Sequence, residues 1–424
     1  MINENLLQFA WKFRLYNNQN IKLLTGETLE VLSPGYHNKD AGPDFQDARL
    51  KIGGVHWAGN VEVHIRSSDW FRHNHPEDEA YSNIILHVVN ENDSEVKDRN
   101  GIPVPVLELK SILPGDLLNR WEVLNQRRNP IPCSEMERPD SFTLQNWLDR
   151  LLIERLEEKL NRINTILRLT SNDWQEAFYV FLARSFGFKI NAVPFELLAR
   201  SVPLKTVIKH EQSSFQLEAL FFGQSGLLNQ NLTDAYPVKL WEEYNFLQRK
   251  FNLIPIEPHL WKFLRLRPGN FPGIRIAQFA DIMSKASSLF LNLIETTQVD
   301  QLRKVLAVSA TGYWETHYLF DAASAGKKKH IGEAAIEGLL INTIVPFLFI
   351  YGTYRGDEPM KARSLQLLEQ LKPEKNALLT DWNSMGIQAQ TAGESQALLQ
   401  LRTEYCNKNR CLECALGHRI LKKK

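Results

Sequence analysis

The hydrophobic periodicity of the chain changes once, near residue 130 of 424. Before that point apolar and polar residues mostly alternate, as at Ala48, Leu50 and Ile52, and this alternation predicts half-buried strands. After it, apolar residues recur every three or four positions, which predicts amphipathic helices. The expected fold class is therefore α+β, with a small α/β domain over residues 1–130 and a larger all-α region over 140–400.

The expected elements of the first domain are a helix over 5–17, two strands joined by Gly53-Gly54, a short helix near 77–82 and a strand over 84–89. Prolines beside Val104 and Val106 confine a strand there to a sheet edge. The Asn-Pro-Ile-Pro segment at 129–132 is typical of a linker. Residues 401–424 form a cysteine-bearing tail, which we expect to pack back near Cys133.

Composition excludes several classes of protein. The 50 Lys and Arg residues balance 49 Asp and Glu residues, so the net charge of +1 does not indicate a polyanionic partner. The most apolar stretch, 338–352, is too short to span a bilayer and contains Asn342 and Pro346, so it is predicted to be a core helix. With no signal-like N-terminus, we expect a cytoplasmic protein without a membrane partner. Glycine-rich nucleotide-binding loops and a nucleophile elbow are missing from the sequence, which disfavours an ATPase or a nicotinamide enzyme.

Acidic and histidine side chains are concentrated in the first domain. Asp44 stands where one predicted strand begins, and Glu62 and His64 share a face of the next strand. A hairpin between these strands would bring the two carboxylates together. Two converging carboxylates are a typical protein site for Mg²⁺, which polarises a phosphodiester and activates water.

These residues resemble the PD-(D/E)XK nuclease superfamily. Pro43-Asp44 is similar to its first motif, and Glu62-Val63-His64 is similar to its Glu-x-Lys motif with histidine in place of lysine. The order of the surrounding helices and strands is also similar. The resemblance implies a restriction-endonuclease-like domain in which Asp44, Glu62 and the Val63 carbonyl bind Mg²⁺ or Mn²⁺. By the same resemblance, His64 takes the place of the lysine that orients or deprotonates the attacking water.

The chain departs from the superfamily at two points. A neutral imidazole acts as a base near pH 7 but does not supply the positive charge of lysine. The acidic residue that many relatives carry on the first helix has no clear counterpart, since only Glu4 is nearby. A metal-dependent phosphodiesterase or nuclease acting on DNA or RNA is thus the first hypothesis. The second is a nucleic-acid- or protein-binding scaffold that keeps the nuclease-like fold but has lost catalysis.

A third hypothesis is a zinc hydrolase that uses His73, His75 and His87, because a His-x-His pair binds zinc. Polar residues on a strand face or in a loop are also often merely solvated. Over its whole length the chain resembles an uncharacterised bacterial family of unknown function. This resemblance rests on Gly42-Pro43-Asp44-Phe45, Ser68-Asp69-Trp70 and Ala219-Leu220-Phe221-Phe222-Gly223, and it implies no activity.

The four cysteines are too few for a disulfide scaffold. Cys406, Cys411 and Cys414 lie within nine residues of one another, and Cys133 or His418 could complete a set of four ligands. This spacing favours structural zinc, with an iron–sulfur cluster or unliganded thiols as alternatives. Some PD-(D/E)XK nucleases carry an iron–sulfur cluster on three C-terminal cysteines and one distant cysteine, although their distant cysteine precedes the nuclease core.

Two basic segments favour nucleic acid as the partner, and the sequence does not identify protein partners. The segment 261–275 carries four positive charges, no acid and interleaved aromatic residues, and the tail from Arg402 is also basic. Arg66 and Arg72 lie beside the acidic and histidine residues. The candidate phosphate contacts are therefore Arg66, Arg72, Lys262, Arg265, Arg267 and Arg275.

Overall fold

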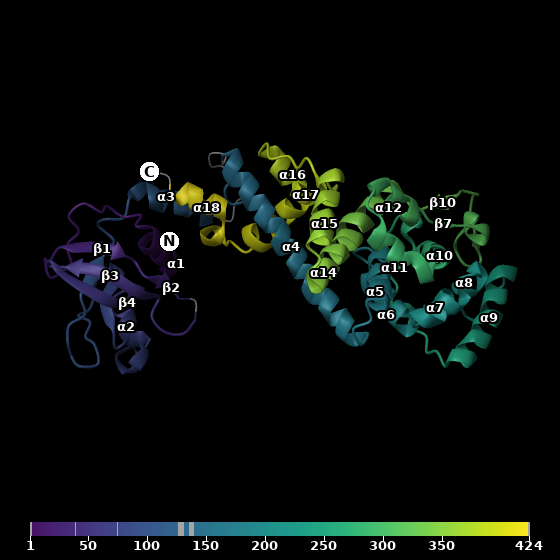
Figure 1. Ribbon diagram of the computed structural model, residues 1–424, viewed down its shortest axis with the longest axis horizontal. Helices are drawn as coiled ribbons and strands as arrows, with labels where there is room; N and C mark the ends of the chain where they lie inside the picture. The colour runs from purple at the N-terminus through teal and green to yellow at the C-terminus, as the bar shows by residue number, and fades with distance from the viewer. Residues whose placement is uncertain (1, 39, 74, 126–130, 135–139, 423–424) are drawn as a thin grey trace. The chain divides into compact units, whose positions relative to one another are not determined.

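The computed structural model describes residues 2–38, 40–73, 75–125, 131–134 and 140–422. It divides into two compact units, one formed by Met1–Trp147 with Leu401–Lys424 and the other by Leu148–Gln400. The expected α+β class is confirmed (Figure 1). The tail belongs to the same unit as the N-terminal domain, while Asn129 and Pro130 of the expected linker lie outside the described residues.

A six-stranded mixed sheet forms the centre of the first unit. Its order is β1-β3-β4-β5-β6, and β2 also pairs with β3. Strands β1, β3 and β4 are antiparallel neighbours, whereas β4, β5 and β6 run parallel. The strands are β1 (Leu29–Ser33), β2 (Tyr36–His37), β3 (Phe45–Ile52), β4 (Val55–Arg66), β5 (Ile84–Glu91) and β6 (Val106–Glu108).

The β3–β4 hairpin follows from the sequence as expected. Ala48, Leu50 and Ile52 are buried, while the residues between them face outward or are half-buried. Gly53 and Gly54 adopt φ of 55° and 88°, the left-handed region that a tight hairpin turn requires. The edge position of β6 also agrees with the prolines beside it.

The connection between the parallel strands β4 and β5 differs from the expectation. The helix expected near 77–82 is replaced by an earlier helix, α2 (Asp69–Arg72), and two 3₁₀ turns, His75–Glu77 and Glu79–Tyr81. Asp93 holds the start of this connection by accepting hydrogen bonds from the Ser67 and Ser68 hydroxyl groups at 3.0 and 2.8 Å. The connection places two histidines above the C-terminal half of β4.

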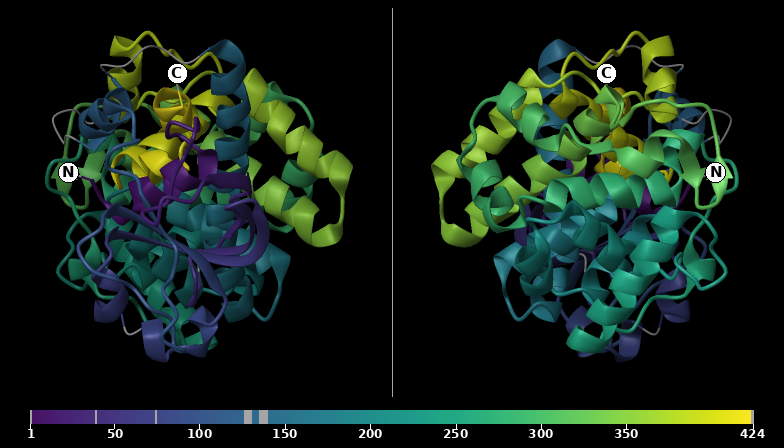
Figure 2. Two further views of the ribbon diagram at one scale, coloured as in Figure 1. Left: turned by 90° about the vertical axis from the view of Figure 1, so that its left-hand side faces the viewer. Right: turned by 90° about the vertical axis from the view of Figure 1, so that its right-hand side faces the viewer.

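Helix α1 (Glu4–Phe13) packs on β4 and β5 and is shorter than expected. It starts at Asn3, whose side chain accepts a hydrogen bond from the Leu6 N–H, and ends at Arg14 in the left-handed conformation. Helices α3 (Gly115–Asn125) and α18 (Ala415–Leu421) pack together in the same unit (Figure 2, left). The first unit is thus completed by the last helix of the chain.

The second unit is helical, as the periodicity predicts. Aromatic residues such as Phe186, Phe221 and Phe279 lie fully buried in its core. Three two-residue strands and one of three residues complete it. The helices are α4 (Ser141–Leu169, which begins in the first unit), α5 (Trp174–Phe186), α6 (Ala192–Ser201), α7 (Leu204–His210), α8 (Ser214–Gln224), α9 (Ala235–Phe251), α10 (Pro272–Met283), α11 (Ala286–Glu295), α12 (Val299–Leu306), α13 (Glu333–Leu339), α14 (Val345–Arg355), α15 (Glu358–Gln370), α16 (Ala377–Ser384) and α17 (Ala392–Gln400).

The apolar stretch around residue 345 is longer than expected. A π-helical turn, Leu340–Ile344, joins α13 and α14 into one helix, Glu333–Arg355. By length and composition this 23-residue helix could cross a membrane, so the prediction that the segment is too short was wrong. Within the structure, 67% of its most apolar window is buried, as in the core helix of a folded domain.

Glu218 of α8 gives the second unit a testable dependence on pH. Glu218 is 9% exposed, and its carboxylate accepts hydrogen bonds from the Tyr236 hydroxyl at 2.6 Å and the Trp314 indole at 2.9 Å. Burial, reinforced by the charge of Asp281, raises the pKa of Glu218 to about 7. Between about pH 4.5 and pH 7, Glu218 therefore keeps its proton in the folded state. In the unfolded chain, where its pKa is 4.5, it has already released that proton.

We expect the free energy of unfolding to fall by on the order of 2 kcal/mol as the pH rises through this window, and to level off above it. Glu218→Gln keeps both acceptor contacts without the titration and should reduce this slope by the share that Glu218 contributes. Urea unfolding at about pH 5 and about pH 8 measures the effect. Glu242→Gln, at an exposed position of α9, is the matched control. An unchanged slope in Glu218→Gln would contradict the assignment.

Candidate metal centre

Four potential metal ligands meet on one face of the sheet in the first unit. Glu62 and His64 lie two residues apart on β4, so their side chains project from the same face. His73 and His75 come from the connection that follows α2. We call these four residues the histidine–carboxylate cluster.

The spacing within the cluster is that of ligands around one ion. His64 Nε2 lies 3.2 Å from His73 Nδ1 and 3.3 Å from His75 Nε2. Glu62 Oε1 lies 3.2 Å from His75 Nε2 and 3.5 Å from His64 Nε2. Nitrogens bound to tetrahedral zinc are about 3.3 Å apart, because each lies about 2.0–2.1 Å from the metal. The three imidazole nitrogens all lie within 4.8 Å of one another.

Protons alone do not satisfy this arrangement. His64 Nε2 faces two other ring nitrogens and the Glu62 oxygen, yet a ring nitrogen has a single proton or a single lone pair in the plane of the ring. One hydrogen bond can therefore be made well, and the other contacts remain unfavourable. A cation at the common point is favourable for all four groups at once.

His87 supports the cluster from the neighbouring strand β5. It is fully buried, and its Nε2 lies 2.8 Å from His64 Nδ1. We assign the shared proton to His64 Nδ1, because this tautomer leaves the His64 Nε2 lone pair facing the cluster. His87 is thus a positioning residue, and its other ring nitrogen, Nδ1, has no hydrogen-bond partner within the described part of the chain.

His87→Ala should weaken metal binding by about 10- to 100-fold, since partners of ligating histidines fix their tautomer and orientation. Competition with a chelator, using Mn²⁺ or Zn²⁺, measures this change. Wild-type affinity in the variant would show that His87 has no part in the centre.

Asp44 and Glu62 are linked by their own backbone. Asp44 Oδ2 accepts a hydrogen bond from the Val63 N–H at 3.0 Å, and the Asp44 N–H donates to Glu62 Oε2 at 3.1 Å. Gln8 of α1 donates to Asp44 Oδ1 at 2.8 Å. Glu62 therefore turns one oxygen to the histidines and the other to Asp44.

Glu4 borders the open side of the cluster. Its Oε1 lies 3.9 Å from His64 Nε2, and its side chain is 38% exposed. His73 is exposed as well, whereas the other three members of the cluster are buried. Solvent therefore reaches the centre between α1 and His73.

Burial shifts the pKa values of Asp44, Glu62, His64 and His87 toward their uncharged forms. It raises the pKa of Asp44 to about 7 and of Glu62 to about 8, and the neighbouring Glu62 charge raises that of Asp44 further. It lowers the pKa of His64 to about 2 and of His87 to about 3. Neutral imidazole is the form that binds metals, and a cation among buried carboxylates stabilises their ionised form.

The structure brings together the three residues predicted to be catalytic, Asp44, Glu62 and His64. It also merges two hypotheses that the sequence kept apart, because Glu62 shares a centre with His73 and His75. His87, which the zinc hypothesis placed with His73 and His75, contacts His64 Nδ1 instead and is not part of the group of three histidines. Glu4 was discounted as an acidic residue of the site and Gln8 was missed, although their spacing of one helical turn places them on one face of α1.

The predicted phosphate contacts have different environments. Arg66 and Arg72 are exposed beside Asp69, which accepts from the Arg66 backbone and pairs with the Arg72 side chain at 2.8 Å. Lys262, Arg265 and Arg267 are exposed in the second unit.

Arg275 was predicted wrongly as a surface phosphate contact. It is 6% exposed, because helix α10 turns it into the core. Its guanidinium donates to Gln278 and Asn270 at 2.9 and 2.6 Å and lies over the Phe188 ring. Its side chain therefore contributes to the packing of the second unit.

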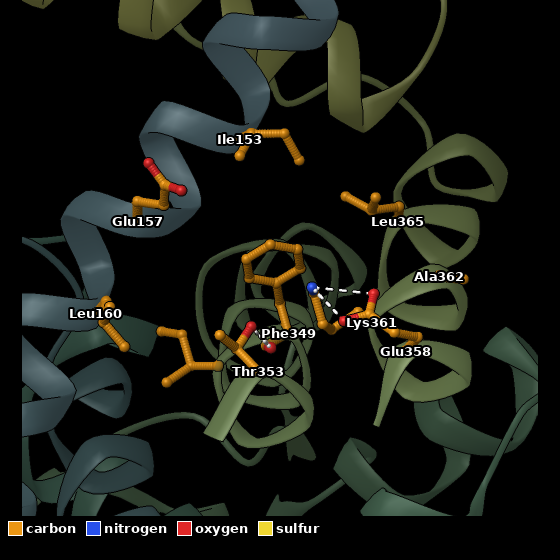
Figure 3. A pocket seen from close by; sticks show the side chains of 10 residues that line it. Ile153, Glu157, Leu160, Phe349, Thr353, Glu358, Lys361, Ala362 and Leu365 are labelled. Carbon is orange, nitrogen blue, oxygen red and sulfur yellow. Dashed lines mark hydrogen bonds and ion pairs between the residues drawn. The ribbon is translucent and has the colours of Figure 1, made fainter. Parts of the chain in front are cut away.

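A groove of about 410 Å³ lies in the second unit between α4, α14 and α15 (Figure 3). Its lining is mainly apolar, including Ile153, Phe349 and Leu365. Lys361 and Glu358 at its edge pair with each other at 2.9 Å. The groups at this groove resemble ordinary packing and surface pairing, so the candidate chemistry lies in the first unit.

Fold and site together define a two-unit α+β protein with a histidine–carboxylate cluster on its mixed sheet. The family model described as "Protein of unknown function (DUF2851)" matches residues 4–377. The chain belongs to this family, and the match includes every residue of the cluster. No curated protein and no solved structure gives a significant match.

Proposed function

We propose that this chain is a metal-dependent hydrolase that cleaves phosphodiester bonds in nucleic acid. The observation that carries the proposal is the set of four contacts, 3.2–3.5 Å long, that join Glu62, His64, His73 and His75 through His64 and His75. A divalent metal bound there would lower the pKa of a coordinated water and polarise the scissile phosphate.

The environment of the cluster favours catalysis over a purely structural metal site. Structural zinc sites are closed, whereas catalytic sites keep an open position. Here the exposed His73 and the half-exposed Glu4 leave one side accessible, and Glu4 Oε1 lies 3.9 Å from His64 Nε2, beyond hydrogen-bond distance. Asp44 supplies a further carboxylate beside Glu62, where it can orient water or a second cation.

The phosphodiester substrate is supported by the order of the elements. Helix α1, the β3–β4 hairpin and the crossover to the parallel strand β5 occur in the order typical of PD-(D/E)XK nucleases. Asp44 directly precedes β3, and Glu62 lies within β4, as the motif requires. Arg66 and Arg72 are exposed near this site and provide contacts for phosphate oxygens.

The three histidines change the expected metal. Imidazole ligands suit zinc, manganese and iron better than magnesium, which prefers oxygen ligands and retains its water. We therefore propose Mn²⁺ or Zn²⁺ at the cluster, in place of the Mg²⁺ that two carboxylates alone would favour.

A cleavage assay on single- and double-stranded DNA and RNA tests the proposal. With Mn²⁺ or Zn²⁺ added, the wild-type chain should cut at least one substrate, and Glu62→Gln should not. Glu91→Gln is the matched control, because Glu91 lies on β5 and pairs with the exposed Lys110. Cleavage that persists in Glu62→Gln, or metal binding without any cleavage, would overturn the proposal.

Two further measurements separate the other two hypotheses. A zinc hydrolase of another class would hydrolyse a carboxyl ester such as p-nitrophenyl acetate and leave bis-p-nitrophenyl phosphate intact. A scaffold would bind nucleic acid in a salt-sensitive manner, and Glu62→Gln would leave that binding unchanged.

A further inference from the structure

The four cysteines, Cys133, Cys406, Cys411 and Cys414, all lie in the first unit and form no disulfide. Among the described residues, the group of three ligand atoms within 4.8 Å of one another belongs to the histidines of the histidine–carboxylate cluster and includes no cysteine. The zinc ion or iron–sulfur cluster predicted at the cysteines therefore remains a prediction.

Arg275 of α10, in the second unit, carries a buried positive charge that no carboxylate of the described residues balances. Its guanidinium donates to the side-chain amide oxygens of Gln278 and Asn270, which are both uncharged. Its Nε has no hydrogen-bond partner, and no carboxylate lies within ion-pair distance of it, in the described part of the chain. Burial lowers the pKa of Arg275 to about 10, and no neighbouring charge offsets this shift. At neutral pH the group is therefore charged, buried and unpaired, which is unfavourable without a bound anion.

The position of Arg275 in its helix adds to this imbalance. Arg275 lies in the first turn of α10, where the backbone N–H groups already give the helix a partial positive charge. This turn contains no acidic residue, and the preceding residue, Phe271, has no side-chain group that caps the helix. An anion beside the guanidinium would offset both positive charges.

A cavity of about 160 Å³ lies beside Arg275. Two further potential donors line it, Asn270 and the exposed Lys189. Asn270 Oδ1 already accepts from Arg275, so the amide NH₂ group of Asn270 remains a donor. Phe188 also lines the cavity, and Arg275 Cζ lies 4.5 Å from the centre of its ring. The other side chains of the lining are mostly apolar and include Phe186, Ile190, Phe195 and Leu266.

Hydrogen bonds fix the groups around this cavity. Gln278 Nε2 donates to the Lys329 carbonyl oxygen at 3.0 Å, which leaves Gln278 Oε1 to hold Arg275. The Asn191 side chain donates to and accepts from the backbone of Lys262, both at 2.9 Å. The cavity is therefore pre-formed, which lowers the entropic cost of binding a ligand.

We propose that this cavity binds a small organic carboxylate with an apolar body, whose carboxylate group pairs with Arg275. A guanidinium binds a carboxylate through two N–H groups, and Nε supplies one that is unused. The apolar walls fit a hydrocarbon body, whereas a phosphate group carries more charge and needs more donors than the cavity offers. The volume is below the roughly 300–1,000 Å³ of pockets for drug-sized ligands, so the ligand is a short branched or aromatic acid. This inference does not depend on the proposed hydrolase activity.

Thermal unfolding and isothermal titration of the full chain with benzoate and isovalerate, at constant ionic strength, test the proposal. At least one of these acids should bind the wild type and raise its melting temperature. Benzyl alcohol, which has a similar shape but no charge, should do neither. Arg275→Met should weaken binding of the acid by about 10- to 100-fold, because it removes charge-assisted hydrogen bonds. Arg267→Met, at an exposed arginine nearby in the sequence, is the matched control and should bind the acid as the wild type does.

Arg275→Met is expected to fold, because an apolar side chain of similar length replaces a buried unpaired charge. If it does not fold, wild-type crystals soaked in para-bromobenzoate decide, since a bromine anomalous peak in the cavity supports the proposal and its absence overturns it. Acid binding that Arg275→Met leaves unchanged would also overturn it. Binding of inorganic phosphate or of a phosphorylated oligonucleotide, but of neither carboxylate, would make the cavity a phosphate site and overturn the proposal as well.

Discussion

Replacing His64 by alanine is expected to weaken Mn²⁺ or Zn²⁺ binding at the histidine–carboxylate cluster by about 100-fold or more. His64 has the largest expected effect because its Nε2 lies within 3.5 Å of a ligand atom from each other member of the cluster. Its removal also leaves His87 buried without its hydrogen-bond partner. Isothermal titration with each metal measures the loss.

The matched control is His56→Ala. His56 is an exposed histidine on the same strand, β4, but lies on the part of the strand that pairs with Lys51 of β3. This variant should bind metal as the wild type does. Circular dichroism and thermal unfolding show whether each variant is folded. A folded His64→Ala protein with undiminished affinity would remove His64 from the centre.

Replacement of Glu62 and replacement of Asp44 are expected to have different effects on metal binding and cleavage. Glu62→Gln should lose both metal and cleavage, because Glu62 Oε1 is a ligand atom of the cluster. Asp44→Asn should retain metal at the cluster and lose cleavage by about 10²- to 10⁴-fold, the range expected when a group that positions or deprotonates water is removed. Parallel measurements of metal content and cleavage rate in the two variants reveal the split.

Asp47→Asn is a suitable control for Asp44→Asn. Asp47 is an exposed residue three positions further along, with φ of 55°, a conformation that asparagine tolerates well. It should leave both metal content and rate unchanged. Loss of metal from Asp44→Asn would instead make Asp44 a direct ligand, and an undiminished rate would exclude it from the reaction.

The local sequence pattern was sufficient to predict much of the fold. The alternation at Ala48, Leu50 and Ile52 and the glycine pair after them define the β3–β4 hairpin, because strand faces and tight turns depend on neighbouring residues. The same hairpin brings Asp44 to Glu62. This part of the site was therefore predictable from the sequence.

The remainder of the site depends on contacts that have no local signal. His73 and His75 reach β4 through short, irregular turns whose shape is fixed by packing around Trp70 and Tyr81. Glu4 lies at the site because the burial of Leu6 and its neighbours sets the rotation of α1 on the sheet. Periodicity identifies a helix and its apolar face, but it does not specify which polar residue stands opposite a strand 60 residues later.

Anomalous diffraction from crystals of the full chain soaked in Mn²⁺ or Zn²⁺ tests the central claim most directly. We predict a metal peak about 2.0–2.2 Å from Glu62 Oε1, His64 Nε2 and His75 Nε2, with His73 Nδ1 or water completing the coordination. The His64 Nδ1–His87 Nε2 contact should persist in that structure. A fully soaked crystal with no anomalous peak among these four residues would contradict the account.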